Sequence, residues 1–236
     1  MSPIKKTRAI GTILPSSNRM VERATLAVLA EFPDVDACFT RIPYFGASNG
    51  QPVDGYHVAS FLEAADLLAH AKVDVICWNG TRGAGLGFTP DRELCDQISQ
   101  RTGLPALTTA LATLDLLTSH RLTRIAVLNQ GSPAESERLT RQFDRHEIDV
   151  VAIRSLEVRD NYAASNIAPA ELAHLTRSVV EEAAPDAVLI WSTNFAGYSI
   201  AADLQAELGV PVFDSATVGV KASLHVITDS FILVDG

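Results

Sequence analysis

The sequence predicts an α/β protein of two pseudo-symmetric lobes, each a parallel sheet flanked by helices, with the site in the cleft between them. Two observations support this fold class. Short apolar, β-branched segments alternate with amphipathic segments of helical period along almost the whole chain, which is typical of parallel strands covered by helices on both faces. In addition, three segments of the first half match three segments of the second half in the same order, which indicates an internal repeat.

The expected strands are short, apolar and bounded by turn residues. In chain order they are residues 9–14, 37–42, 73–78, 106–108, 125–128, 150–154, 187–191, 212–213 and 231–234. Helices are expected between them, at residues 19–31, 57–71, 91–101, 109–119, 133–145, 169–183, 198–208 and 216–224.

Residues that favour helix N-termini support several of these helices. Ser17 and Asn18 precede the first helix, Pro90 and Asp91 the third, and Pro169 the sixth. Residues 43–56 and 155–168 fit neither pattern, so we expect long loops there, which often line binding sites.

The internal repeat is the most informative feature of the sequence. Residues 74–85 (DVICWNGTRGAG) align without a gap with residues 186–197 (DAVLIWSTNFAG). Residues 103–109 (GLPALTT) likewise align with 209–215 (GVPVFDS), and residues 8–14 (RAIGTIL) with 123–129 (TRIAVLN). We therefore expect one lobe from residues 1–118 plus 216–236 and another from residues 119–215.

The repeat also predicts a site, because ligands of open α/β sheets bind beyond the carboxyl ends of the strands. Gly80 and Thr81 should then face Ser192, Thr193 and Asn194 across the cleft. Each of these turns is expected to lead into a helix, whose first N–H groups lack internal partners and suit an anion. The expected ligand is a small carboxylate.

Composition excludes several other functions. A net charge of −9 argues against nucleic acid as a partner. The three cysteines and six histidines show neither CxxC nor HExxH spacing, so no disulfide framework or metal site is expected. The first apolar run is too short for a signal or a membrane span, so we expect a cytoplasmic protein with no membrane partner. Glycines 80, 83, 85 and 87 do not form a nucleotide-binding fingerprint.

Several short motifs occur in a characteristic order: Leu14-Pro15-Ser16-Ser17-Asn18 with Glu22, residues 73–76 leading to Gly80-Thr81, Asp160-Asn161, Ser192-Thr193-Asn194 and residues 209–215. Through these motifs nearly the whole chain resembles the aspartate/glutamate racemase superfamily, and within it the maleate cis-trans isomerases and arylmalonate decarboxylases. The resemblance implies two similar lobes, no metal or organic cofactor, a homo-oligomer, and usually two cysteines acting on opposite faces of the substrate.

Neither cysteine position of the family holds a cysteine in this chain. By strand alignment the first is Gly80 and the second is Ser192. Glycine at the first position is similar to the arylmalonate decarboxylases, which keep only the second thiol, whereas serine at the second departs from both groups. Residues 129–132 (NQGS) also replace a turn that carries a tyrosine in maleate isomerases.

The resemblance and the paired turns favour a cofactor-independent isomerase or lyase acting on a small carboxylate or dicarboxylate. A hydrolase that opens a cyclic imide, amide or hydantoin-like ring with Ser192 or an activated water, and a non-catalytic carboxylate-binding protein, stay open as alternatives.

Ser192 is the expected catalytic residue, although a serine at a strand end is equally suited to bind a carboxylate or to cap a helix. Asn18 is equally placed to cap the first helix, and Arg82 to start a helix in solvent. Cys77 is expected in the core. The expected substrate-binding residues are Pro15, Ser16, Asn18, Gly80, Thr81, Arg82, Asn161, Thr193 and Asn194.

Overall fold

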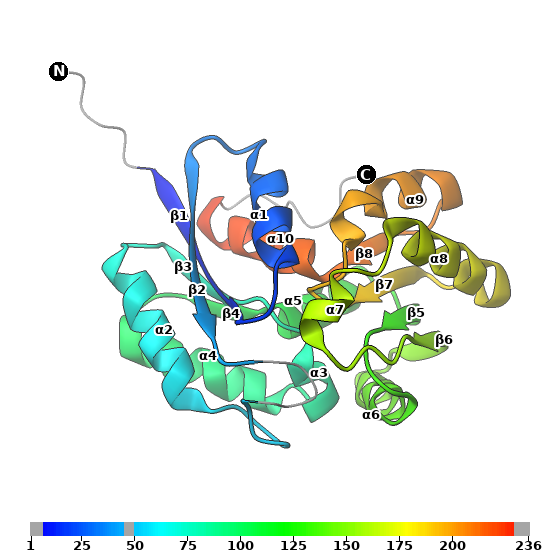
Figure 1. The fold of residues 1–236 in the computed structure, drawn as a ribbon, viewed down its shortest axis with the longest axis horizontal. Coiled ribbons are helices and arrows are strands. Elements are labelled where there is room, and N and C mark those ends of the chain that lie inside the picture. Colours follow the sequence, from blue (N-terminus) through cyan, green and yellow to red (C-terminus); the bar gives the residue numbers. More distant parts are fainter. Residues whose placement is uncertain (1–6, 45–49, 229–236) are drawn as a thin grey trace.

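The predicted fold class is confirmed by a computed structural model, which describes residues 7–44 and 50–228. Two four-stranded parallel sheets lie side by side with helices around them (Figure 1). Their strand orders are β2-β1-β3-β4 and β6-β5-β7-β8. The second order is the first with every strand number raised by four, so the two halves share one topology.

The first sheet and the helices between its strands come from the first half of the chain. These elements are β1 (Arg8–Pro15), α1 (Met20–Leu29), β2 (Val35–Ile42), α2 (Val58–His70), β3 (Val75–Trp78), α3 (Arg82–Leu86), α4 (Thr89–Thr102), β4 (Ala106–Thr108) and α5 (Thr109–Ser119).

The second half forms the second sheet, its helices and the final helix. These elements are β5 (Arg124–Asn129), α6 (Pro133–Asp144), β6 (Asp149–Ser155), α7 (Asn161–Ala164), α8 (Pro169–Ala183), β7 (Ala187–Trp191), the 3-10 turn η1 (Gly197–Ser199), α9 (Ala201–Leu208), β8 (Val212–Asp214) and α10 (Ser215–Thr228).

Equivalent aspartates make equivalent bonds in the two halves. The carboxylate of Asp74 accepts a hydrogen bond from the backbone N–H of Ala9 at 2.8 Å, and that of Asp186 accepts one from the backbone N–H of Arg124, the equivalent of Ala9, at 2.9 Å. Each aspartate thus ties the start of one strand to the start of its neighbour. The internal repeat read from the sequence is therefore a repeat of hydrogen-bonding roles as well as of strands.

Equivalent caps start the helices that follow β4 and β8. The hydroxyl of Thr108 accepts from the N–H of Leu111 at 3.1 Å, and the carboxylate of Asp214 accepts from the N–H of Thr217 at 2.9 Å. Both bonds satisfy a donor that a helix N-terminus leaves free.

The helix expected after Gly80 and Thr81 is the short α3, and the three glycines at positions 83, 85 and 87 lower its helix propensity. The structure explains one of them: a Cβ on Gly83 would lie 1.4 Å from a carboxylate oxygen of Asp91. Asp91 is fully buried and accepts a bond from the Tyr56 hydroxyl at 2.8 Å. Asp91 lies in the first turn of α4, and no side-chain hydrogen bond caps this helix. The sequence had indicated Asp91 as a residue that favours the start of the helix.

Two other predictions need correction. The expected loop 155–168 contains α7, which Asp160 caps by accepting from the N–H of Ala163 at 2.8 Å. The expected helix 198–208 is divided into η1 and α9, because the backbone of Ile200 leaves the helical region (φ −132°). The strand expected at 231–234 lies outside the described residues.

The last helix, α10, returns to the first sheet (Figure 1). Its residues Val220 and Leu224 are buried in one apolar cluster with Ile10 of β1 and Val75 of β3. The final helix thus covers strands at the other end of the sequence. The lobe boundaries at residues 118 and 216 stay a prediction.

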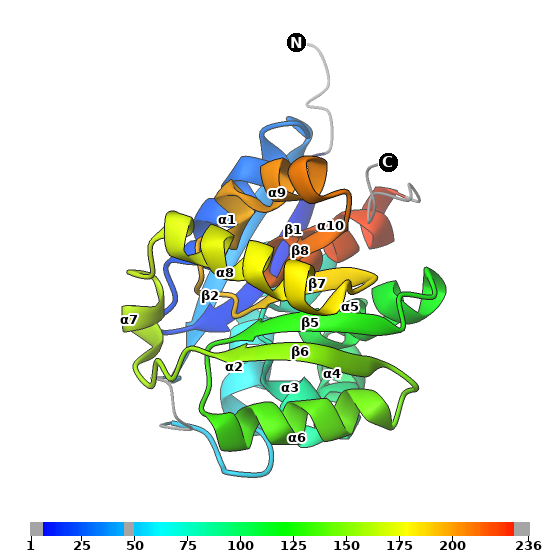
Figure 2. The same cartoon turned by 90° about the vertical axis from the view of Figure 1, so that its right-hand side faces the viewer.

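Helices α6 and α8 flank the second sheet (Figure 2). Each packs apolar residues against it, such as Leu139 of α6 and Leu172 of α8. Within residues 7–44 and 50–228, none of the helices combines the length and the apolar character needed to cross a bilayer.

Candidate active site

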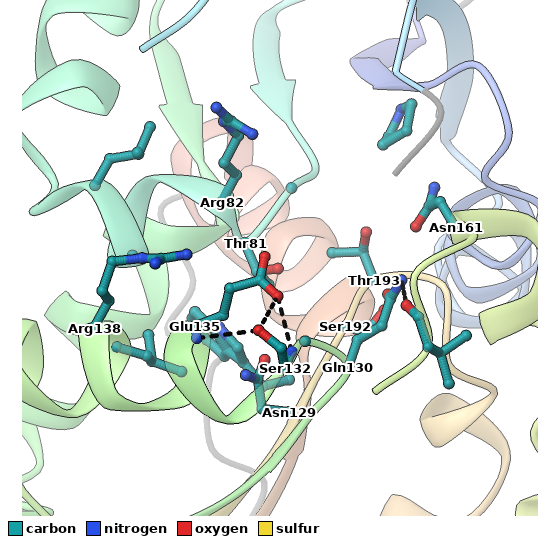
Figure 3. Close-up of a pocket in the computed structure, with 18 of the residues that line it drawn as sticks. Thr81, Arg82, Asn129, Gln130, Ser132, Glu135, Arg138, Asn161, Ser192 and Thr193 are labelled. Carbon is teal, nitrogen blue, oxygen red and sulfur yellow. Dashed lines mark hydrogen bonds between the residues drawn. The ribbon is translucent and has the colours of Figure 1, made fainter. Parts of the chain in front are cut away.

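A cavity of about 540 Å³ lies where strand ends of the two sheets meet. Gly80 and Thr81, which follow β3, line it together with Ser192 and Thr193, which follow β7. Figure 3 shows Thr81, Ser192 and Thr193 in this cavity. The two polar turns of the internal repeat therefore open onto one space. Both long loops also contribute, through Val53 from the first and Arg159 from the second.

The expected site residues divide into two groups. Seven line the cavity: Pro15, Gly80, Thr81, Arg82, Asn161, Ser192 and Thr193. Ser16, Asn18 and Asn194 stand behind this lining and bond to other parts of the protein.

Gly80 leaves no room for a side chain. A Cβ there would lie 2.5 Å from two carbons of the Trp78 indole, well inside ordinary contact distance. Trp78 itself is 1% exposed and packs edge-on against Phe61, with ring centroids 5.0 Å apart. The indole thus fills the space that a thiol at position 80 would need.

Thr81 offers two hydrogen-bond donors to the cavity. Among the described residues, neither its backbone N–H nor its hydroxyl has a protein partner. Helix α3 begins directly after it, as expected. The turn after β7 differs from the prediction, since Ser192 leads through a non-helical turn into the short η1.

Ser192 is held by two hydrogen bonds. Its hydroxyl donates to the side-chain oxygen of Gln130 at 2.5 Å and accepts from the backbone N–H of Asn194 at 3.1 Å. An amide oxygen is a very weak base, so Gln130 cannot take the proton from Ser192. No histidine or cysteine is found among the described residues that line the cavity, and Ser192 therefore lacks the partner that activates a serine nucleophile.

Asn18 performs the capping role that the sequence left open. Its side-chain oxygen accepts from the N–H groups of Met20 and Val21 at 2.9 and 3.0 Å. Its side-chain nitrogen donates to the Thr193 hydroxyl at 3.0 Å. Asn18 therefore starts α1 and also joins the first half of the chain to the second.

Asn194 is a second tie between the halves. Its side-chain oxygen accepts from the N–H groups of Arg19 and Met20 at 2.9 and 3.2 Å, and its side-chain nitrogen donates to the carbonyl of Asn161. The residue is fully buried, which explains why it supports the site instead of lining it.

Arg82 lines the cavity and holds a loop. Its guanidinium donates to the carbonyls of Pro52 and Val53 and lies 5.9 Å from the centroid of the Tyr44 ring. It is therefore neither a free cation aimed at a ligand nor an unconstrained residue in solvent.

Cysteine chemistry finds no support in this cavity. Burial raises the pKa of the Cys77 thiol to about 12, and it does the same for Cys95. Burial and the nearby Asp36 also raise the pKa of Cys38. None of the three lines the cavity, and Cys77 is in the core as expected.

Sequence reasoning missed Tyr44, Trp78 and Gln130 as cavity residues. The repeat could have indicated Gln130. When residues 8–14 are aligned with 123–129, the next position pairs Pro15 with Gln130, and both line the cavity.

Comparison with known proteins gives a consistent result. The sequence profile of the arylmalonate decarboxylase family matches residues 53–231. No curated protein sequence matches the chain.

Several solved structures have a similar fold. Maleate isomerase from Pseudomonas putida with maleate is 20% identical, with 93% of this chain and 91% of that chain covered and a TM-score of 0.80. Nocardia farcinica maleate cis-trans isomerase bound to TRIS is 21% identical, with coverage of 93% and 92% and a TM-score of 0.81. A mutant of arylmalonate decarboxylase in the liganded form is 22% identical, with coverage of 95% and 94% and a TM-score of 0.80.

Proposed function

Because this chain belongs to the arylmalonate decarboxylase family, we propose that it is a cofactor-free isomerase or lyase acting on a small carboxylate or dicarboxylate. One observation carries the proposal: the two turns that end equivalent strands, one from each half, line the same cavity. The proposed substrate lies between Thr81 and Thr193, with Ser192 beside it.

The donors at the two turns suit a reaction that builds negative charge on a carboxylate. Thr81 and Thr193 each have a backbone N–H without an acceptor in the described part of the protein, and both residues line the cavity. Fixed donors of this kind stabilise an oxyanion because they need no reorganisation when the charge develops.

Of the two reaction classes, the geometry supports a lyase better. In decarboxylation of a malonate-type acid, the bond to the departing carboxylate breaks and CO₂ leaves. The electron pair stays on the carbon as an enediolate, and a water molecule then supplies the proton. This route needs oxyanion donors and no protein base, whereas isomerisation by covalent addition needs a nucleophile.

Turnover and mutation test the proposal together. Malonate, methylmalonate and phenylmalonate are incubated with the protein, and CO₂ release is followed with a pH indicator, while loss of maleate absorbance reports isomerase activity. Thr81→Val and Thr193→Val should each lower the rate about 10- to 100-fold because each removes one oxyanion donor. Thr140→Val, on α6 outside the cavity lining, is the matched control.

Full activity in both cavity variants would refute the assigned roles. A second candidate function, carboxylate binding without turnover, is favoured by the lack of a thiol among the cavity residues described above. Calorimetry that shows binding of malonate, with no product formed, would support this second function. The hydrolase alternative that uses Ser192 requires an activated serine, and the bond to Gln130 gives no such activation; release of acid from a cyclic imide or hydantoin would instead support the alternative that uses an activated water.

The homo-oligomer and the cytoplasmic location stay predictions. Sedimentation velocity of the purified protein would measure the first, and fractionation of cells that express it would measure the second.

A further inference from the structure

We propose that Gln130 and Asn18 fix the hydroxyls of Ser192 and Thr193 in opposite hydrogen-bonding roles, so that the site selects a carboxylate with a hydroxyl on the adjacent carbon. This inference rests on the proposed function, since it assigns the substrate class of the same cavity.

The hydroxyl proton of Ser192 is already used in a hydrogen bond within the protein. The side-chain nitrogen of Gln130 donates to the carbonyl of Val158 at 3.1 Å, so its oxygen is the end that faces Ser192. The Ser192 hydroxyl donates to that oxygen and accepts from the N–H of Asn194. A hydroxyl oxygen has two lone pairs, and the one that remains is available to a ligand. Ser192 therefore accepts a hydrogen bond and cannot donate one.

The proton of Thr193 is free. The side-chain oxygen of Asn18 is used by the N–H groups of Met20 and Val21, so Asn18 must present its nitrogen to Thr193. Thr193 accepts from that nitrogen, and its own proton has no acceptor among the described residues. Thr193 therefore donates to the ligand.

Asn161 supplies a second acceptor by the same logic. The hydroxyl of Ser17 donates to the carbonyl of Tyr44 at 2.9 Å, so it can only accept from Asn161, whose nitrogen lies 3.1 Å away. The amide oxygen of Asn161 is then left for the cavity, and Figure 3 shows it turned toward Thr193. Ser192 and Asn161, which line the cavity together with Thr193, thus present two acceptors that a bare carboxylate would leave unmatched.

A ligand that satisfies this pattern has a carboxylate for the threonine donors and a neutral O–H donor for Ser192 and Asn161. A hydroxyl fits better than an ammonium, because both acceptors are uncharged. The nearby carboxylate of Glu135 already accepts from the N–H and the hydroxyl of Ser132. The inferred substrate class is therefore the 2-hydroxy carboxylates.

Calorimetry with two acids that differ by one hydroxyl tests this assignment. 2-Hydroxysuccinate should bind the wild-type protein about tenfold more tightly than succinate, the effect of one to two good hydrogen bonds. Ser192→Ala should reduce this ratio to about two or less. Ser119→Ala, at the end of α5 and outside the cavity lining, should keep the wild-type ratio.

Variants of Gln130 separate this role from a merely structural one. Gln130→Met releases the Ser192 proton, so Ser192 becomes a donor: succinate should bind more tightly and the preference for the hydroxy acid should vanish. Gln130→Glu keeps an acceptor for Ser192, so it should weaken both acids through charge repulsion while the ratio persists. Circular dichroism verifies that each variant is folded.

The possible outcomes distinguish failure of this inference from failure of the proposed function. Equal binding of the two acids by the wild type, or a Gln130→Met variant that weakens both equally, overturns the inference and leaves the proposed function standing. Failure of both acids to bind at millimolar concentration overturns the inference and the proposed function together. Tighter binding of aspartate than of 2-hydroxysuccinate would identify the donor as an ammonium group and refute the hydroxyl assignment.

Discussion

Adding one methyl group at position 80 tests how closely Trp78 packs against the site. In Gly80→Ala the new Cβ lies 2.5 Å from two indole carbons, about 0.9 Å short of the 3.4 Å at which ordinary contacts begin. Trp78 has little room to retreat, because its ring centroid is 5.0 Å from that of Phe61 and 6.4 Å from that of Tyr56.

The expected cost follows from this overlap. Inserting a methyl group into a closely packed region displaces side chains at a cost of about 1–3 kcal/mol, so Gly80→Ala should lower the free energy of unfolding by that amount. Gly85→Ala is a matched control, because nothing lies within 4 Å of its Cβ position in helix α3. It should raise the free energy of unfolding by about 0.5–1 kcal/mol.

Urea titration followed by tryptophan fluorescence measures both changes. In the double variant Gly80→Ala with Trp78→Phe, the smaller ring should recover part of the loss caused by the methyl group, which a double-mutant cycle quantifies. If Gly80→Ala is as stable as the wild type, the argument that the indole excludes a side chain at position 80 is wrong.

Three further perturbations probe the elements that hold the site. Burial raises the pKa of Asp91 from its ordinary value near 3.8 to about 6, so the folded state binds this proton more tightly than the unfolded chain does, and Asp91 lowers stability as pH rises from about 4 to about 6. Asp91→Asn should therefore exceed the wild type by up to about 3 kcal/mol at pH 8 and converge with it below pH 4 in urea titrations; an equal difference at both pH values would contradict this cause. Ser132→Ala removes the capping box of α6 and should cost about 1 kcal/mol in the same assay, so an unchanged midpoint would show that the cap contributes nothing. Asn194→Ala leaves the N–H of Arg19 without its acceptor and removes the buried bond to the carbonyl of Asn161, which should cost about 1–3 kcal/mol, measured by thermal unfolding against the exposed control Asn166→Ala.

The fold could be predicted well from the sequence because the internal repeat constrains both the position of the polar turns and the strand order of the two sheets. The alignment of residues 74–85 with 186–197 placed two polar turns at equivalent strand ends, and the two sheets have the same strand order. Ligands of parallel α/β sheets bind beyond the carboxyl ends of the strands, so the sequence alone predicts that Thr81 and Ser192 lie near one another.

The roles of individual polar residues were harder to predict. Asn194 looked like a ligand contact, yet its side chain points to the N-terminus of α1, a partner about 174 residues away. Gln130 gave no catalytic pattern, yet it decides where the Ser192 proton lies. A side-chain hydrogen bond depends on orientations across two halves of the chain, and neither periodicity nor spacing encodes them.

The return of α10 to the first sheet has a consequence for how the protein is made. Val220 and Leu224 complete an apolar cluster with Ile10 and Val75, so a ribosome must release almost the whole chain before that cluster can close. The first half would emerge with its strands incompletely covered, and this nascent state should depend on chaperones until synthesis ends. Expressing residues 1–118 alone should accordingly yield an aggregation-prone fragment, which addition of a peptide spanning α10 should render more compact.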